Sequence, residues 1–331
     1  MEKRKFEKLG IETSLLGFGC MRFPATPDGK IDEPRAEKLL DRAIAAGVNY
    51  IDTAYPYHNG DSEPFVGKVL QKYDRNSFYL ATKLPVWAIE SVDDAKRIFA
   101  EQLERLRTDH IDFYLMHSMS KERWDKVKEL GIVEFCEQLK AEGKIRYLGF
   151  SFHDTYEAFE EVLRGRDWDF CQIQLNWLDY DFQDAKAKCR VLNAWNIPIW
   201  VMEPLRGGKL AHLNDAQMQQ LNASALGSAN SSACSAVEWS FRWLLGIPNV
   251  KTILSGMSDL AQVEENCRIF QESVPLSEVE EGVLMDVAES LKGGVPCTAC
   301  RYCVDSCPQE IDIPMMMNAY NDLQFDTSFT V

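Results

Sequence analysis

Long hydrophobic runs are missing from this chain of 331 residues. Its apolar runs are far shorter than the ~18 residues that a membrane-spanning helix needs, and no apolar signal region follows the charged start Met-Glu-Lys-Arg-Lys. Positive charge is scarce as well, because 36 Lys and Arg residues face 51 Asp and Glu residues and leave a formal net charge of −15. Such an acidic chain disfavours polyphosphate surfaces. We therefore expect a cytoplasmic protein that binds no membrane and no nucleic acid.

Evenly spread cysteines are also lacking. Of the ten cysteines, six are scattered singly, whereas Cys297, Cys300, Cys303 and Cys307 lie close together. In a reducing compartment, such clustering favours a metal centre over disulfides. The spacing C-x-x-C-x-x-C-x-x-x-C-P is that of bacterial ferredoxins. Zinc is the alternative metal. The chain has no second cysteine run that could share ligands, as two-cluster ferredoxins do. The spacing predicts an iron–sulfur cluster, most simply 4Fe-4S, in which either Cys307 folds back or a scattered cysteine completes the ligand set.

Short apolar runs recur at fairly regular distances, and segments with helical spacing separate them. This alternation over about 255 residues matches an α/β fold of the (β/α)8 type, the TIM barrel. A doubly wound sheet is the alternative, but Gly17-Phe18-Gly19 lacks the third glycine of the first turn in that fold. The predicted strands are 15–19, 48–51, 78–81, 111–116, 145–150, 170–175, 197–201 and 250–254.

The segments outside this alternation predict the domain organisation. Residues 5–8 and 11–14 predict a small hairpin that covers the barrel floor. The Gly-, Ser- and Asn-rich stretch 206–235 predicts a long loop. After residue 270 the alternation stops, and 277–291 predicts a helix that begins with a capping box of Ser277 and Glu280. We therefore expect a barrel domain over 1–275 and a small, mainly helical iron–sulfur tail over 276–331.

Ionisable side chains follow three neighbouring predicted strands, namely Asp52, Lys83 and His117. The carboxyl ends of barrel strands form one pocket, so these groups are expected to converge. Tyr55 and Tyr57 lie in the loop just after Asp52. An ammonium beside a phenol favours the phenolate, so a Lys–Tyr pair suits proton donation during reduction of a carbonyl group. The spacing alone does not choose between the two tyrosines.

Several short motifs carry a resemblance to the aldo-keto reductase superfamily over residues 1–275. The matching residues are Asp52-Thr53-Ala54 with Tyr57, Ser62-Glu63 with Gly67, Lys83, Leu115-Met116-His117, Gly149-Phe150-Ser151, Gln172 with Asn176, and Glu265-Asn266. Together with the cysteine motif, these residues make the chain resemble the ferredoxin-tailed aldo-keto reductases of bacteria.

The resemblance implies a catalytic tetrad of Asp52, Tyr57, Lys83 and His117, with Tyr57 as the general acid. It also implies that NADP or NAD lies across the barrel mouth. The implied dinucleotide contacts are Gly19, Cys20, Ser151, Gln172, Met202, Pro204, Leu205, Gly207, Ser255, Gly256, Gln262, Glu265 and Asn266.

Three departures from the family pattern concern the dinucleotide. Phe152 replaces a common Asn, and Met202 stands where an aromatic ring often stacks on the nicotinamide. Gly256, Met257 and Gln262 stand where the family has the Lys-Ser and Arg that clamp the 2′-phosphate of NADP. Without those charge-assisted hydrogen bonds, NADP preference does not carry over.

The sequence thus predicts an NAD(P)H-dependent oxidoreductase that reduces a small-molecule aldehyde or ketone and carries an accessory cluster. The cluster serves as electron conduit, sensor or structural support, and a conduit would exchange electrons with a ferredoxin or flavodoxin. The alternative is a non-catalytic redox module that binds a dinucleotide and a partner protein.

Overall fold

A closed barrel of parallel strands dominates the computed structural model, which describes residues 1–181, 184–225, 234–272, 274–291, 304, 307–309 and 311–322. The strands pair in the order β10-β3-β4-β5-β6-β7-β8-β9, so sequential strands are neighbours. This order confirms the predicted (β/α)8 barrel. The strands are β3 (Leu16–Gly19), β4 (Tyr50–Asp52), β5 (Tyr79–Leu84), β6 (Ile111–Met119), β7 (Ile145–Phe152), β8 (Phe170–Gln174), β9 (Ile199–Met202) and β10 (Val250–Gly256).

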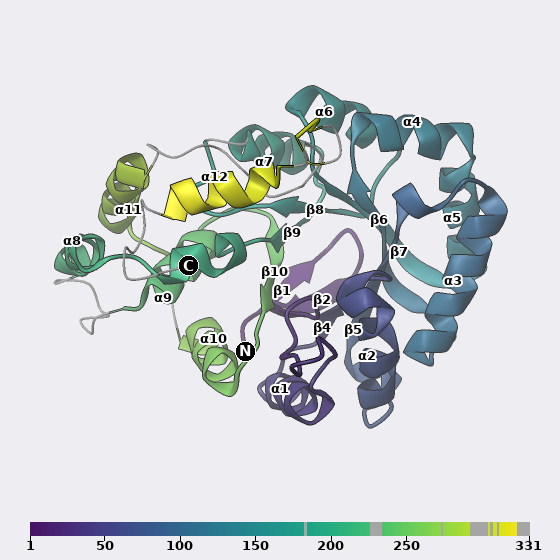
Figure 1. Ribbon diagram of the computed structural model, residues 1–331, viewed down its shortest axis with the longest axis horizontal. Helices are drawn as coiled ribbons and strands as arrows, with labels where there is room; N and C mark the ends of the chain where they lie inside the picture. The colour runs from purple at the N-terminus through teal and green to yellow at the C-terminus, as the bar shows by residue number, and fades with distance from the viewer. Residues whose placement is uncertain are drawn as a thin grey trace. The chain divides into compact units, whose positions relative to one another are not determined.

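Helices of the first compact unit, which comprises Met1–Gln174, Ala187–Met202 and Pro248–Glu272, run outside the strands (Figure 1). Local signals set their ends: in α3, the Ser91 side chain accepts a hydrogen bond from the Asp94 N–H, and Arg107 ends the helix in a left-handed conformation with φ 52°. The helices are α1 (Glu33–Ala45), α2 (Ser62–Leu70), α3 (Val92–Leu106), α4 (Lys121–Glu129), α5 (Ile132–Ala141), α6 (Tyr156–Arg164), α7 (Ala185–Ala194) and α10 (Leu260–Glu272), with the 3-10 turns η1 (Tyr57–Gly60), η2 (Arg75–Ser77) and η3 (Val86–Ala88).

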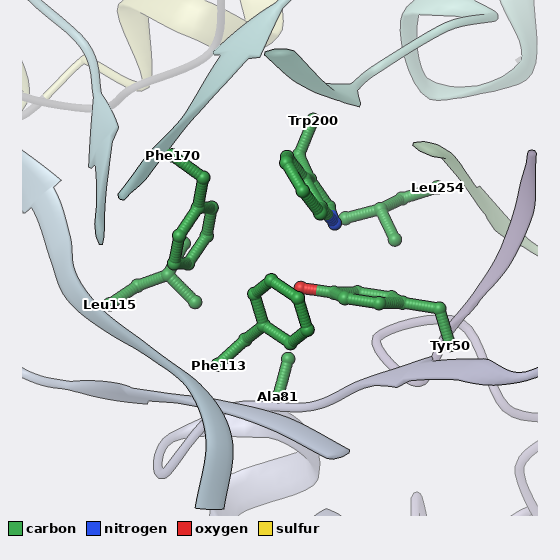
Figure 2. Packing of buried hydrophobic residues seen from close by; sticks show 7 residues of the cluster. All are labelled: Tyr50, Ala81, Phe113, Leu115, Phe170, Trp200 and Leu254. Carbon is green, nitrogen blue, oxygen red and sulfur yellow. The ribbon is translucent and has the colours of Figure 1, made fainter. Parts of the chain in front are cut away.

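The barrel interior is filled by side chains from six strands that point toward one another (Figure 2). Phe113 packs against the rings of Tyr50, Phe170 and Trp200, with centroid separations of 5.0, 5.1 and 5.2 Å. Each such aromatic pair adds about 0.5–1.5 kcal/mol beyond simple burial. Glycine makes room for this packing, because a Cβ at Gly149 would lie 2.5 Å from the Phe170 ring.

The predicted hairpin at the amino end is confirmed, with its first strand shifted toward the start of the chain. β1 (Lys3–Phe6) pairs with β2 (Ile11–Ser14) in antiparallel register. Ile11 packs against the barrel cluster, and the Arg4 guanidinium donates a hydrogen bond to the Val250 carbonyl at 2.8 Å. The hairpin therefore covers the floor of the barrel, as expected.

The second compact unit comprises Leu175–Lys186, Glu203–Ile247 and the described residues of Ser273–Val331. The expected loop over 206–235 is wrong in part, because η4 (Arg206–Ala211) and the helix α8 (Asp215–Ala225) occupy much of it. Asn214 and Gln217 explain the helix, since the side chain of each accepts a hydrogen bond from the backbone N–H of the other. The Gly-, Ser- and Asn-rich composition of the stretch predicted a loop, although Asn214 and Gln217 mark the start of a helix. The remaining helices of the unit are α9 (Ala236–Leu245), α11 (Glu278–Leu291) and α12 (Ile313–Asp322).

The capping box predicted for the tail helix is confirmed. In α11, Glu280 accepts hydrogen bonds from the Ser277 N–H and hydroxyl at 2.8 and 2.9 Å, and the Glu280 N–H returns one to Ser277 Oγ. The predicted cluster ligands Cys297, Cys300 and Cys303 lie outside the described residues, whereas Cys307 is described and half-buried. Over the described ranges, no helix is both long and apolar enough to span a bilayer.

Candidate active site

Register at the carboxyl ends of β4 and β5 brings Asp52 and Lys83 together. The Lys83 ammonium lies 2.6 Å from Asp52 Oδ1 and donates a second hydrogen bond to the Thr53 carbonyl at 2.7 Å. The two side chains are only 1% and 3% exposed. Burial acts to lower the pKa of Lys83, but Asp52 and Tyr57 outweigh it and raise that pKa. Lys83 is therefore a fixed positive charge inside the barrel mouth.

Tyr57 and Tyr55 point to different neighbours, which separates the two candidate acids. The Lys83 ammonium lies 4.9 Å from the centroid of the Tyr57 ring, and the His117 ring centroid lies 6.0 Å from it. The Tyr55 hydroxyl instead donates a hydrogen bond to Glu101 Oε2 at 2.6 Å, and the Arg105 guanidinium stacks on its ring. Of the two, only Tyr57 lies with the other residues of the predicted tetrad.

The pKa of Tyr57 differs from the sequence-based expectation in its net direction. Burial raises this pKa, and that effect outweighs the opposite influence of Lys83. The phenol therefore stays protonated at neutral pH. Lys83 still favours a phenolate over the same site without an ammonium, which is what a donor needs at the moment of proton transfer.

His117 lies at an irregularity of β6, where the register with β7 shifts between Met116 and Met119. Its neighbour Ser118 has a left-handed backbone with φ 56°, and the Ser118 N–H donates to Ser151 Oγ at 2.7 Å. Such irregularities reorient side chains next to active sites. Burial holds the pKa of His117 well below its usual value, and Lys83 adds to this effect, so the imidazole is neutral.

Ser151 and Gln172 are register partners on β7 and β8, and both are buried. Gln172 Oε1 has no hydrogen-bond partner among the described residues. A buried acceptor of this kind needs a donor, and an amide N–H of a nicotinamide carboxamide supplies one. These two residues therefore fit the predicted dinucleotide.

The ends of β3 and β10 carry a second group of predicted dinucleotide contacts. Gly19 pairs with Gly256, and Ser255 Oγ accepts a hydrogen bond from the Asn266 side chain at 3.0 Å. Cys20 follows Gly19 and its N–H donates to the Asp52 carbonyl at 2.8 Å. Gln262 and Glu265 lie on α10 with Asn266, and Gln262 Oε1 accepts from the Ser258 N–H at 2.8 Å. The fold thus brings these positions near one edge of the barrel mouth.

The other predicted contacts divide between the units. Met202 ends β9 in the first unit, whereas Pro204, Leu205 and Gly207 belong to the second. There, Gly207 has φ 68° and Gly208 has φ 101°, conformations that glycine adopts readily.

Three buried polar residues near Lys83 escaped the sequence-based search for functional groups. Glu63 belongs to one of the family motifs, whereas Thr82 and Gln102 belong to none, yet each of the three is 0% exposed. A signal for Gln102 did exist, because it interrupts the apolar face of the 92–106 helix. For metals, the described part of the chain holds no group of three or more potential ligand side chains.

The (β/α)8 barrel carries a paired Lys and Asp, a tyrosine and a neutral histidine at the carboxyl ends of its strands, which is the arrangement that the sequence resemblance implies for an oxidoreductase. The family model described as "Aldo/keto reductase family" matches residues 15–282, so the chain belongs to this family. It is an oxidoreductase.

Relatives and solved structures agree with this assignment. The chain is 28% identical over 294 residues to the uncharacterized oxidoreductase YqkF of Bacillus subtilis, with 80% of this chain and 90% of that protein covered. It is 25% identical to the NADH-specific methylglyoxal reductase of Escherichia coli, with 88% and 100% covered. The aldo-keto reductase AKR11C1 from Bacillus halodurans superposes with a TM-score of 0.71 at 27% identity, with 87% and 96% covered.

Proposed function

We propose that this protein reduces the carbonyl group of an aldehyde or ketone, with Tyr57 as the general acid. The observation that carries the proposal is the position of the Tyr57 ring, 4.9 Å from the Lys83 ammonium and 6.0 Å from the His117 ring. When bound, a nicotinamide dinucleotide supplies the hydride.

The side chains of the tetrad handle the proton and the developing charge. Neutral His117 presents a ring N–H to the carbonyl oxygen and orients it toward Tyr57. Tyr57 donates its phenolic proton to that oxygen as negative charge develops there. Lys83, held by Asp52 at 2.6 Å, stabilises the phenolate that remains.

A matched pair of tyrosine variants tests this proposal. Tyr57→Phe deletes the acid, so we expect a loss of about 10²- to 10⁴-fold in kcat for aldehyde reduction. Dinucleotide affinity, measured by quenching of tryptophan fluorescence, stays near that of the wild type. The control Tyr55→Phe removes a hydroxyl bonded to Glu101 and retains most of the activity. Wild-type turnover in Tyr57→Phe with loss in Tyr55→Phe would refute the assignment.

For the dinucleotide, we propose a weak preference for NADPH over NADH. The Gln262 side chain is engaged by Ser258, and a Cβ at Gly256 would lie 2.7 Å from Arg22 Cγ. The Arg22 side chain thus passes beside the position where the family has a lysine, and we propose that its charge partly replaces that of the lysine. We expect the preference to stay below about 100-fold, or ~2.7 kcal/mol, and to shrink further in Arg22→Ala when both dinucleotides are titrated. A larger preference that persists in Arg22→Ala would contradict this.

We further propose that the cysteine motif binds one 4Fe-4S cluster through Cys297, Cys300, Cys303 and Cys307, and that the cluster exchanges electrons with a ferredoxin or flavodoxin. The support is the spacing of three, three and four residues followed by Pro308. Iron and acid-labile sulfide in anaerobically purified protein, lowered in Cys303→Ala, are the expected result. Stoichiometric zinc without sulfide would exclude the cluster, and failure of a reduced ferredoxin or flavodoxin to reduce it would leave a structural role.

A further inference from the structure

Gln102 is a buried primary amide on the apolar face of α3. It is 0% exposed, and its neighbours on that face are the buried residues Ile98, Phe99 and Leu106. Burial of an amide among apolar groups is unfavourable unless hydrogen bonds satisfy it. The partners of this side chain therefore account for its presence.

Those partners belong to three different elements. The Gln102 amide group donates to Glu63 Oε1 at 2.9 Å and to the Lys83 carbonyl at 3.0 Å, and Thr82 Oγ1 lies 3.2 Å away. The Gln102 carbonyl oxygen accepts from the Tyr114 hydroxyl at 2.8 Å. We call Glu63, Thr82, Gln102 and Tyr114 the Gln102 network, and all four residues are 0% exposed.

Each of these elements carries, or directly follows, a residue of the tetrad. Lys83 itself receives a bond from Gln102. Glu63 lies in α2, which follows the turn η1 that begins at Tyr57, and Tyr114 lies in the same strand as His117. The Gln102 side chain thus bonds to β5, which carries Lys83, to β6, which carries His117, and to α2, which follows the turn that begins at Tyr57.

Backbone packing makes this connection tight. Glu63 also accepts a hydrogen bond from Thr82 at 2.6 Å and lies 3.4 Å from the Arg105 guanidinium. At Gly67, a Cβ would overlap the Arg105 carbonyl and would lie 2.7 Å from the Leu106 backbone. Helix α2 therefore packs directly against α3, which connects Gln102 to the segment that follows Tyr57.

We propose that Gln102 is a positioning residue that sets the distances among Tyr57, Lys83 and His117. This inference rests on the proposed function, in which Tyr57 donates the proton. Gln102 touches none of the reacting groups of the tetrad directly and acts through the backbone of Lys83 and through Glu63. The influence of an ammonium on a neighbouring phenol falls with their separation, so a shift of Lys83 changes how Tyr57 titrates.

The first test is Gln102→Leu, which removes every hydrogen bond of the side chain. We expect kcat for carbonyl reduction to fall about 10- to 100-fold, as misplacement of reacting groups does elsewhere, while KM stays unchanged. The basic limb of the pH profile moves to higher pH, because Lys83 favours the phenolate less.

A second variant covers the case in which Gln102→Leu fails to fold. Gln102→Glu keeps an acceptor for Tyr114 but donates nothing when ionised. The carboxyl group introduced at position 102 lies beside that of Glu63, and repulsion between two carboxylates raises the pKa at which one of them takes up a proton. We therefore expect the kcat of Gln102→Glu, relative to the wild type, to recover as the pH falls and the new carboxyl becomes a donor. Absence of this recovery, with kcat equal to that of the wild type at all pH values, overturns the proposal.

Two further measurements separate positioning from general loss of stability. The control Thr252→Val removes a buried hydroxyl that bonds Thr13 and Ser14 at the other end of the barrel, and its pH profile should match the wild type. Without dinucleotide, the phenolate absorbance of each protein minus that of its Tyr57→Phe counterpart reports the titration of Tyr57. A shift to higher pH in Gln102→Leu supports the proposal. An unchanged titration refutes it, whereas an inactive wild type would refute only the proposed reaction.

Discussion

Two buried ion pairs, one in each unit, are equally buried but differ in how completely their hydrogen bonds are satisfied. Lys83–Asp52 and Arg242–Glu280 each have side chains that are 1% and 3% exposed. Arg242 donates to both oxygens of Glu280 at 2.9 and 3.0 Å and to the Val274 carbonyl at 3.0 Å. Asp52 Oδ2, in contrast, has no hydrogen-bond partner among the described residues.

The carboxyl groups differ in the direction of their pKa as a result. Burial acts to raise the pKa of Glu280, but its hydrogen bonds to Ser277 and its pairing with Arg242 outweigh burial and lower that pKa. Burial raises the pKa of Asp52, and Lys83 only partly opposes this. A buried ion pair is costly to break by removing one partner, although replacing both partners is often neutral. We therefore expect the satisfied pair to matter for stability when one partner is lost, and the incompletely satisfied pair to matter for the groups beside it.

The largest expected effect comes from removing the pair at the active site. In Asp52→Asn/Lys83→Met the phenolate of Tyr57 loses its ammonium, so kcat falls by about 10²- to 10⁴-fold. Replacement of a buried ion pair by neutral groups is often neutral or stabilising. Urea unfolding should therefore show a free energy of unfolding no lower than that of the wild type. A clear loss of stability in this double variant would erase the contrast between the two pairs.

Removal of one partner from the other pair should act on stability instead. Glu280→Leu leaves the Arg242 guanidinium buried without its carboxylate, which lowers the free energy of unfolding by about 3–5 kcal/mol. The double variant Arg242→Met/Glu280→Leu should recover most of this loss. Denaturant unfolding of the three proteins checks both statements, and kcat per folded molecule should stay unchanged in each. No recovery in the double variant would mean that packing around α11, rather than charge, sets the stability.

A smaller effect follows from the pH dependence of Glu280. Its pKa is lowered by folding, so its contribution is fully present above the unfolded-state value of about 4.3 and disappears as the pH falls through the lower folded value. The difference in free energy of unfolding between wild type and Glu280→Gln should therefore shrink below about pH 4. Unfolding curves at several pH values test this, and a difference that grows on acidification would contradict it.

The smallest expected effect is the absence of an inflection from His117. Its pKa lies well below 6.5 because of burial and the nearby Lys83. Between pH 6 and 7 the imidazole should stay neutral, and kcat/KM for carbonyl reduction should show no change assignable to it. An inflection near pH 6.5 that disappears in His117→Gln would show that His117 titrates in the working enzyme.

The sequence predicted the barrel and the placement of the tetrad because both depend on local order. An apolar run followed by Asp52, Lys83 or His117 marks a strand end, and parallel strands bring their ends together. The proposal that Tyr57 is the acid needed the family resemblance, since Tyr55 and Tyr57 share one loop. The structure distinguishes them because the Tyr55 hydroxyl bonds to Glu101, which lies on another element, α3.

Contacts between distant segments could not be predicted in the same way. Gln102 bonds to Glu63 and Tyr114 only because α2, α3 and β6 pack in one particular arrangement. Arg242 and Glu280 are 38 positions apart and belong to different helices. Periodicity identifies the buried face of a helix, but it does not say which element covers that face.

The Arg242–Glu280 pair, which lies within the second unit, has a consequence for how helix α11 can change among related proteins. In the sequence, Pro275 lies between α10 and α11. A descendant shortened at that point would retain Arg242 in its interior and lose the carboxylate that neutralises it. We therefore expect relatives that lack α11, or that have lost the carboxylate at position 280, to carry an uncharged residue at position 242 as well.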